Sequence, residues 1–247
     1  MILKLSTMNA LIFALGLAVT ALADDCSYSS ICADHTMCIY SGFGDQCGSD
    51  VRYFGVTRDE DKNAVVDAHN KLRSRVALGQ ETLGSPGPQP SAANMQKLEW
   101  DDELAAVAQQ WTDQCSFGHD ACRNVDRFYV GQNVYMSSTF GMEETDVQYW
   151  DQATQSWYNE VNDFDKDMVS SFQSTSGKPI GHYTQLIWAE TKYVGCGFVA
   201  YKGDDGWFNK YYVCNYGPGG NIISQPIYQT GAACSNCSGA CENGLCV

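Results

Sequence analysis

The chain has few basic residues, only one long apolar run and none of the short signatures of common hydrolases. It carries 15 lysines and arginines against 29 acidic residues, a formal net charge of −14. Such a surface repels phosphate backbones and anionic lipids, so we expect neither nucleic acid nor an acidic membrane as the target. G-x-S-x-G and H-E-x-x-H are both absent. No Arg-Gly-Asp triplet occurs, so an integrin-type adhesion role lacks its usual motif.

The one long apolar stretch lies at the N-terminus. Lys4 precedes the run LIFALGLAVTALA, which ends in an A-x-A site at Ala23. A positive start, a short apolar core and small residues before the cleavage point are typical of a secretory signal peptide. A membrane anchor needs about 20 apolar residues, and no later stretch reaches that length. We therefore predict that residues 1–23 are removed, that the protein is secreted and extracellular, and that it has no transmembrane segment.

All 12 cysteines lie after the predicted cleavage point. An even number of cysteines in an exported chain favours disulfides, although Cys234-x-x-Cys237 also has the spacing of a zinc site. Four cysteines fall within 26–47 and four within 234–246, in segments too short to bury a core of their own. We predict a cysteine-rich N-terminal segment over 24–56, a globular domain over 57–228 and a short cysteine-rich tail over 229–247.

Apolar periodicity predicts three helices in the globular part. Thr57 and Glu60 form a capping-box pattern before the first helix, and Gly79 is a stop signal after it. Asp101 can cap the second helix, and the third follows Thr145. The three apolar stripes are Val65, Val66, His69, Leu72 and Val76; Leu104, Val107, Ala108 and Trp111; and Val147, Trp150, Thr154, Trp157 and Val161.

After these helices the apolar period changes to two. YVGCGFVAY at 193–201 and NKYYVCNY at 209–216 flank a Gly-Asp-Asp-Gly turn at 203–206. Opposed residues of an antiparallel hairpin have a constant sum of residue numbers, and pairing Cys196 with Cys214 centres the loop on that turn. Spacing alone therefore predicts a Cys196–Cys214 disulfide. Helices with one apolar stripe and a short antiparallel sheet imply an α/β sandwich, with helices packed on the faces of the sheet.

Read together, GHYTQLIWAETKYVGCG at 181–197 and YYVCNYGPGGN at 211–221 resemble the paired signature of the CAP superfamily of cysteine-rich secretory, antigen-five and pathogenesis-related proteins. AHNKLRSRVALGQET, LEWDDELAAVAQQW and VGQNVY extend the likeness, which is closest to arthropod venom and salivary antigen-five proteins. The resemblance implies an α-β-α sandwich with a central antiparallel sheet. In the tail, four cysteines permit three connectivities. The disulfides expected from the resemblance are Cys26–Cys38, Cys32–Cys122, Cys47–Cys115 and Cys196–Cys214, with Cys234–Cys241 and Cys237–Cys246 in the tail.

The family has a central cavity lined by two histidines and two acids. Carried over residue by residue, three of these positions are His119 in SFGHD, His182 in GHYTQ and Glu160 in SWYNEV. The second acid should follow the glycine of a GEN triplet, but this chain has Gln132 in VGQNV, and the amide lacks a charge that would favour a divalent cation. His119 and His182 could still bind zinc or copper. We expect instead a buried, hydrogen-bonded cluster that supports the sheet and requires no cofactor.

A hydrolase is the alternative interpretation of this cluster. A metal-dependent or His/Glu-based protease would use a histidine as base, Glu160 as its orienter and Thr184 or Ser156 as nucleophile. No nucleophile elbow marks either hydroxyl, so we expect a protein without protease activity. Of the other histidines, His69 is expected in the core and His35 in local structure.

The resemblance implies binding functions of two kinds. Some members bind sterols, fatty acids or eicosanoids, in a cleft between helices or beneath a connection like the proline-rich 85–95.

Arthropod members delivered in venom or saliva meet host proteins as allergens or modulators, and defence in the body fluid is a further alternative. Channel block belongs to longer relatives and is not expected of a chain that stops at Val247. We expect a secreted, non-enzymatic protein whose host or self partner is unknown; a cysteine within the sequon Asn236-Cys237-Ser238 argues against glycosylation there.

Overall fold

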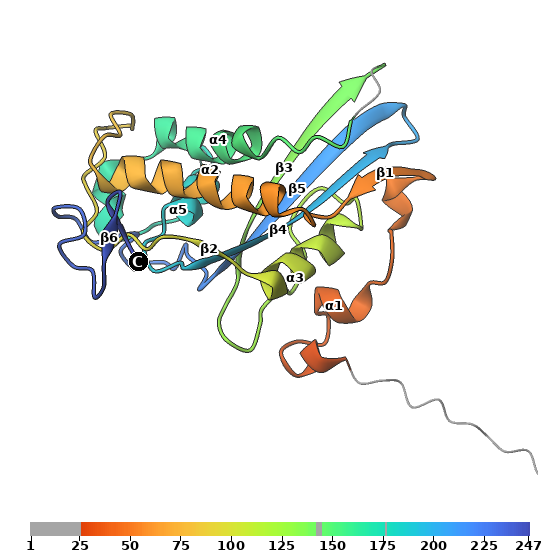
Figure 1. The fold of residues 1–247 in the computed structure, drawn as a ribbon, viewed down its shortest axis with the longest axis horizontal. Coiled ribbons are helices and arrows are strands. Elements are labelled where there is room, and N and C mark those ends of the chain that lie inside the picture. The colour runs from red at the N-terminus through yellow and green to blue at the C-terminus, as the bar shows by residue number, and fades with distance from the viewer. Residues whose placement is uncertain (1–25, 142–144, 176) are drawn as a thin grey trace, which may run out of the picture.

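A five-stranded sheet forms the centre of the molecule in the computed structural model, which describes residues 26–141, 145–175 and 177–247 (Figure 1). The predicted signal peptide lies outside the described residues. Four strands follow the antiparallel order β1 (Asp50–Phe54), β4 (Tyr193–Lys202), β5 (Trp207–Gly217) and β3 (Gly131–Phe140). The short β2 (Glu99–Trp100) pairs in parallel with the start of β4. The sheet is therefore antiparallel, as expected, except for this one pair.

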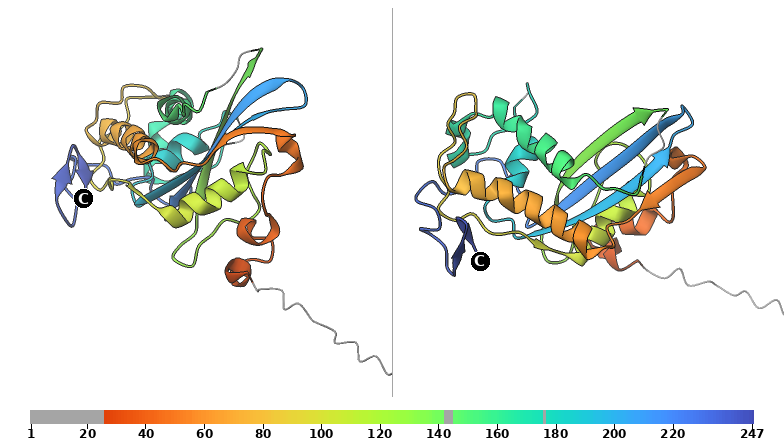
Figure 2. Two further views of the ribbon diagram at one scale, coloured as in Figure 1. Left: turned by 45° about the vertical axis from the view of Figure 1, so that its right-hand side comes forward. Right: turned by 45° about the horizontal axis from the view of Figure 1, so that its top comes forward.

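Helices cover both faces of the sheet. α2 (Asp59–Ala77), α4 (Trp150–Tyr158) and α5 (Gly181–Leu186) pack on one face, and α3 (Asp102–Thr112) packs on the other (Figures 1 and 2). Two 3₁₀ turns, η3 (Asn159–Asp163) and η4 (Lys166–Ser170), follow α4. The predicted α-β-α sandwich is confirmed.

Side chains along β4 alternate between the two faces of the sheet, which explains how one strand contacts both helical layers. Cys196 and Phe198 face the core beneath α2 and α4, while Val199 faces the core beneath α3. Gly195 and Gly197 also lie on the α3 face, where a Cβ at Gly195 would come within 2.2 Å of the Ala105 nitrogen and one at Gly197 within 2.6 Å of Gln109. These glycines let α3 pack directly on the strand backbone.

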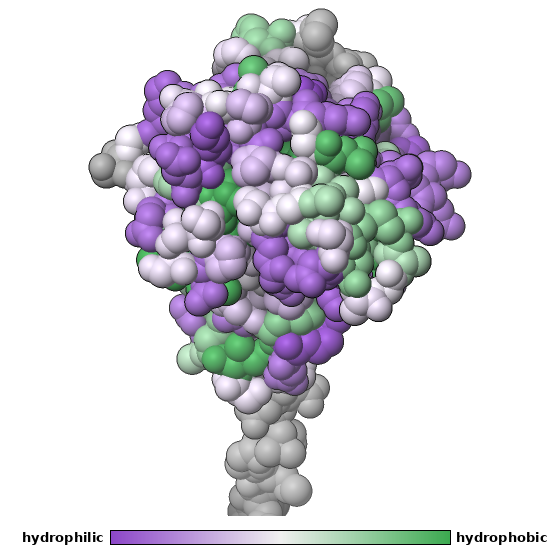
Figure 3. Space-filling model, turned by 90° about the vertical axis from the view of Figure 1, so that its left-hand side faces the viewer, coloured by the Kyte–Doolittle hydropathy of each residue, from purple (hydrophilic) through white to green (hydrophobic). Residues whose placement is uncertain are grey.

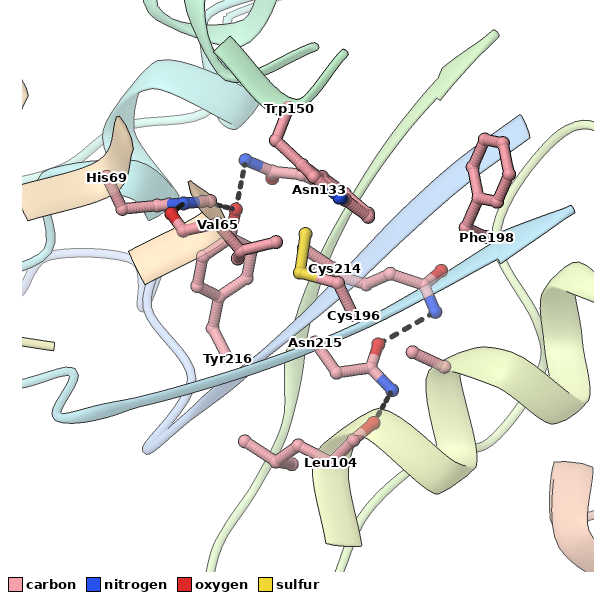
Figure 4. The surroundings of a disulfide bond; sticks show 12 residues. Val65, His69, Leu104, Asn133, Trp150, Cys196, Phe198, Cys214, Asn215 and Tyr216 are labelled. Atoms are coloured by element: carbon pink, nitrogen blue, oxygen red, sulfur yellow. Dashed lines mark hydrogen bonds between the residues drawn. A yellow bond between two sulfur atoms is a disulfide. The ribbon is translucent and has the colours of Figure 1, made fainter. Parts of the chain in front are cut away.

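The hairpin register predicted from spacing is confirmed. Cys196 lies opposite Cys214 and Tyr201 opposite Asn209, so the loop falls on the predicted turn at 203–206. The two cysteines form the expected disulfide, buried between the sheet and α2 (Figure 4).

The predicted helix limits are partly right. The Asp101 carboxylate accepts a hydrogen bond from Leu104 N at 2.9 Å and caps α3, as expected. The prediction of a capping box at Thr57 is wrong, because α2 begins at Asp59 after Arg58, whose side chain makes no capping bond. The third helix begins at Trp150, later than expected, which leaves Val147 outside it and exposed.

Disulfides attach both cysteine-rich segments to this frame. The N-terminal segment contains η1 (Ser27–Ser30), α1 (Thr36–Ile39) and η2 (Asp45–Cys47), and two of its bridges reach the connection after α3. The described residues include no free cysteine. All pairings are those expected: Cys26–Cys38, Cys32–Cys122, Cys47–Cys115, Cys196–Cys214, Cys234–Cys241 and Cys237–Cys246.

The C-terminal tail folds back onto the domain. β6 (Cys241–Glu242) and β7 (Leu245–Cys246) form a two-stranded hairpin. Cys246 N donates to Met95 O at 2.8 Å, and the Leu245 side chain is buried. Asn236 of the sequon is exposed, and its side-chain amide donates to Gln229. None of the helices in the described ranges has the length and apolar character needed to cross a bilayer.

Candidate functional site

The four predicted cavity residues come together where edge strand β3 begins. Gln132 belongs to β3, His119 to the connection before it, Glu160 to η3 and His182 to α5. The His119 and His182 ring centres are 6.4 Å apart. Each imidazole Nδ1 has one partner: Gln132 Oε1 at 2.8 Å for His119 and Glu160 Oε1 at 2.7 Å for His182.

Gln132 fixes the tautomer of His119. Its Nε2 donates to Asp120 Oδ1 at 3.1 Å and to Asn215 Oδ1 at 3.0 Å, so its Oε1 must face the imidazole. His119 Nδ1 is therefore the donor, and Nε2 carries the lone pair in the neutral ring. The pKa of His119 lies below its usual value, chiefly because the surrounding protein removes part of the ring's hydration, and the bond to Gln132 opposes this shift.

Glu160 both orients His182 and caps its helix. Its Oε1 accepts from His182 Nδ1, and its Oε2 accepts the backbone N–H groups of His182 at 2.9 Å and Tyr183 at 3.1 Å. These N–H groups belong to the first turn of α5, where the residue before the helix offers no side-chain cap. A single partly buried carboxylate therefore satisfies the helix end and directs His182 Nε2 away from it.

The expectation of a buried imidazole cluster was wrong for the rings themselves. Gln132 is 8% exposed and the Glu160 side chain 12%, whereas His119 is exposed and the His182 side chain is 29% exposed. Gln132 is buried and Glu160 is largely shielded from solvent, whereas the rings that they hold are not. Solvent reaches the rings from the other side.

A hydrogen-bond chain links this cavity to α2. Asn133 Nδ2 donates to His182 O at 3.0 Å and to the Tyr216 hydroxyl at 3.3 Å. That hydroxyl lies 2.8 Å from His69 Nε2, and His69 Nδ1 lies 2.7 Å from Val65 O (Figure 4). Burial lowers the pKa of His69 to about 4, so the ring is neutral, donating through Nδ1 and accepting through Nε2. The expectation that His69 is a satisfied core residue is confirmed.

Arg73 was not identified from the sequence, yet it holds the segment that follows α5. Its side chain is fully buried where α2 packs against that segment. Burial lowers the pKa of Arg73 to about 9. Within the described part of the chain, its guanidinium donates only to backbone oxygens and has no carboxylate partner; the acceptors are Gln96, Leu186, Trp188, Ala189 and Thr191.

Neither hydroxyl considered as a nucleophile meets an imidazole. Thr184 is buried in α5 and bonds to Ile180 O at 3.0 Å and Asn221 Oδ1 at 2.6 Å. Ser156 lies exposed on α4. The described residues therefore contain no hydroxyl–imidazole pair built from these two candidates.

The cavity suits a metal ion only in part. With both Nδ1 atoms engaged, the Nε2 atoms of His119 and His182 are the two available ligands. Two imidazoles on one tetrahedral zinc have ring centres about 5 Å apart, against 6.4 Å here. Glu160 already accepts three hydrogen bonds, so zinc or copper would have two protein ligands. The separate cluster Cys32, Asp34 and Cys122 lacks thiolates, because its sulfurs form a disulfide.

Comparison with known proteins identifies the family. Residues 66–216 match the model of CAP, the cysteine-rich secretory protein family. The chain belongs to the CAP family. Venom allergen 3 of Solenopsis invicta is 47% identical over 80% of this chain and 84% of its own length, and venom allergen 5 of Dolichovespula arenaria is 46% identical over 82% and 98%.

Solved CAP-fold structures resemble the whole sandwich. The crystal structure of NaASP2 with Zn²⁺ has a TM-score of 0.64 and 34% identity, covering 77% of this chain and 96% of that one. Na-ASP-1 has a TM-score of 0.66 and 32% identity, covering 84% of this chain and 51% of that one. The resemblance inferred from the sequence is thus confirmed.

Proposed function

We propose that this protein is a secreted, non-enzymatic component of venom or saliva that captures a small amphipathic molecule. Its CAP relatives include venom allergens of ants and wasps, and the predicted signal peptide and disulfide framework suit export. Neither Thr184 nor Ser156 bonds to an imidazole among the described residues, which argues against either hydroxyl as an activated nucleophile. Among fatty acids, eicosanoids and sterols, the structure favours an acid.

The observation that carries this proposal is a groove between α2, the tail hairpin and the edge of α4. Its volume is about 850 Å³, well within the range of ligand sites. Figure 3 faces the end of the molecule where the tail and the C-terminal end of α2 lie, and hydrophobic and hydrophilic patches are intermixed on this face. We call this site the tail groove; its apolar lining is Val66, Leu72, Leu78 and Leu245, and its cationic lining is Lys71, Arg75 and Lys97.

Charge distinguishes the ligand classes. The groove contains three cations and two acids, Asp67 and Glu242, in a chain whose net charge is −14. Glu242 pairs with Lys97 at 2.6 Å, while Lys71 is exposed and has no ion-pair partner among the described residues. Lys71 can therefore meet the carboxylate of a fatty acid or eicosanoid, which a sterol lacks.

Calorimetric titration with palmitate, and with cholesterol as the uncharged comparison, tests this function. We expect saturable palmitate binding that Lys71→Glu weakens about three- to tenfold, the scale of an exposed charge interaction that is reversed. Lys192→Glu, an exposed substitution outside the groove lining, should bind like the wild type. If palmitate, arachidonate and cholesterol all failed to bind saturably, the proposed capture of a small amphipathic molecule would be excluded.

Protein recognition is a second candidate, supported by exposed aromatic pairs. Phe43 and Phe54 have ring centres 5.2 Å apart, and Phe140 and Trp207 5.4 Å apart. All four side chains are exposed, and aromatic residues are enriched in protein interfaces. Cross-linking to recipient plasma proteins should give a defined product that Phe54→Ser or Trp207→Ser removes; identical products from wild type and both variants would exclude these pairs.

Zinc or copper binding is a third candidate, supported by the two outward Nε2 atoms. A solved relative, NaASP2, has a crystal structure with Zn²⁺. Here His119 and His182 would hold the ion once their ring centres moved closer than the present 6.4 Å, and Glu160 would orient His182. Zinc titration should give heats that His119→Ala and His182→Ala each abolish. No heat from the wild type would exclude the site.

A further inference from the structure

A smaller pocket shares two residues, His119 and Gln132, with the imidazole cavity. Its volume is about 300 Å³, at the lower end for ligand sites. It borders the start of β3 and the loop after β5, so it is separate from the tail groove. We call it the arginine pocket; it is lined by His119, Arg123, Tyr129, Gly131, Gln132, Gln185, Gly220 and Asn221.

Among the described residues, no carboxylate lines this pocket, in a protein with 29 acidic residues. The nearby Asp120 is fully buried and accepts from Arg123, Thr36 and Gln132. Glu160 is engaged with α5. Neither acid is among the lining residues, and the polar groups that line the pocket are neutral or cationic.

Asp120 also holds Arg123 in place. Arg123 Nε donates to the Asp120 carboxylate, and Nη2 donates to the Asp120 backbone oxygen. Among the described residues, Arg123 Nη1 has no hydrogen-bond partner, and the side chain is only 15% exposed. A guanidinium whose plane is already fixed loses little entropy when its remaining donors bind a carboxylate.

Gln132 keeps the pocket free of negative charge. Its Nε2 faces two acceptors, Asp120 Oδ1 and Asn215 Oδ1. A glutamate at this position would place a carboxylate oxygen next to both acceptor oxygens. An ionised carboxylate has no hydrogen to donate, so neither acceptor would be satisfied. The glutamine therefore matches Asp120, and it removes the charge that would repel an anion from Arg123.

An aromatic ring lines the pocket beside these polar groups. Tyr129 is 59% exposed and belongs to the same lining as Arg123. Small-molecule sites typically combine apolar walls with a few convergent polar groups. We propose that the arginine pocket binds a carboxylate carried on a small apolar group, with Arg123 as the charged contact and Tyr129 at the apolar end.

Benzoate and the neutral, nearly isosteric benzamide test this site by ¹⁵N-resolved NMR titration. We expect benzoate to saturate shifts at Arg123 and Tyr129, and benzamide to bind about tenfold or more weakly, because it lacks the charge-assisted bond. Arg123→Lys keeps a cation beside Asp120 but loses the planar fork, so it should weaken benzoate about tenfold. Gln132→Glu should weaken it similarly through repulsion.

Equal binding of benzoate and benzamide, or no saturable benzoate shift at these residues, would overturn the proposal. So would unchanged benzoate binding in both folded variants. The comparison of two ligands on the wild type needs no substitution, so it decides even where a variant does not fold. Lys71→Glu, in the tail groove, should leave benzoate binding intact; this separates failure of the arginine pocket from failure of the proposed function.

Discussion

Replacing Glu160 by glutamine should change both the stability of the protein and the tautomer of His182. The carboxylate accepts three hydrogen bonds: two from backbone N–H groups at the start of α5 and one from His182 Nδ1. A glutamine can keep its oxygen on the two N–H groups only by turning its NH₂ toward Nδ1. The imidazole must then accept at Nδ1 and carry its proton at Nε2.

The magnitude follows from these bonds. Hydrogen bonds to a charged group contribute about 1.5–3 kcal/mol, against about 1 kcal/mol for neutral ones. Because the oxygen retains its two helix contacts, we expect Glu160→Gln to cost about 1–2 kcal/mol. At about 2–4 °C per kcal/mol for a protein of this size, Tm should fall by about 2–8 °C.

Two measurements decide this prediction. Thermal unfolding gives the change in Tm, and long-range ¹H–¹⁵N NMR gives the tautomer of His182. A variant in which His182 keeps its proton on Nδ1, or whose Tm equals that of the wild type, would refute the role of Glu160 as cap and orienter. Gln155→Glu, an exposed change on α4, is a control that should leave the tautomer unchanged.

Three further predictions concern the frame. Arg73→Met should lower the free energy of unfolding, measured in urea, by about 3 kcal/mol or more, because it leaves several buried carbonyls unpaired. Lys71→Met on the exposed face should have a far smaller effect. Equal effects of the two substitutions would contradict the role of Arg73 in holding the segment after α5. His69 has a folded pKa of about 4, below its ordinary 6.5, so the unfolded chain takes up the proton first, and stability should be constant above pH 6.5 and fall by about 2–3 kcal/mol by pH 4.5. His69→Gln should lack this share of the pH dependence, and the same pH dependence in both proteins would refute it. Replacing Cys196 and Cys214 by alanine should cost about 3 kcal/mol, measured as a lower urea midpoint; a midpoint equal to that of the oxidised wild type would count against the disulfide as a stabilising bridge.

Features set by local geometry were predictable from the sequence. The Cys196–Cys214 register follows from a short turn and the alternation of an antiparallel pair, both of which lie within about 25 residues. Asp101 caps α3 because its oxygen needs only an N–H three residues away. The family resemblance supplied the remaining disulfide pairs, which spacing could not.

Features that depend on distant partners were not predictable. Thr57 and Glu60 match a capping pattern, but α2 begins later, at Asp59. Arg73 is buried because carbonyls more than 100 residues away meet it. The exposure of His119 likewise depends on how its connection packs against β3, which apolar periodicity along the chain does not encode.

Ligand capture in the tail groove is tested most directly by palmitate titration of four proteins: the wild type, Leu78→Gln, Lys71→Glu, and the double variant His119→Ala with His182→Ala. Leu78 and Lys71 line the groove, and neither imidazole does. We expect saturable binding by the wild type, about three- to tenfold weaker binding by each groove variant, and unchanged binding by the imidazole variant. Binding that survives both groove changes, or that is lost with the imidazoles, would contradict capture in the groove.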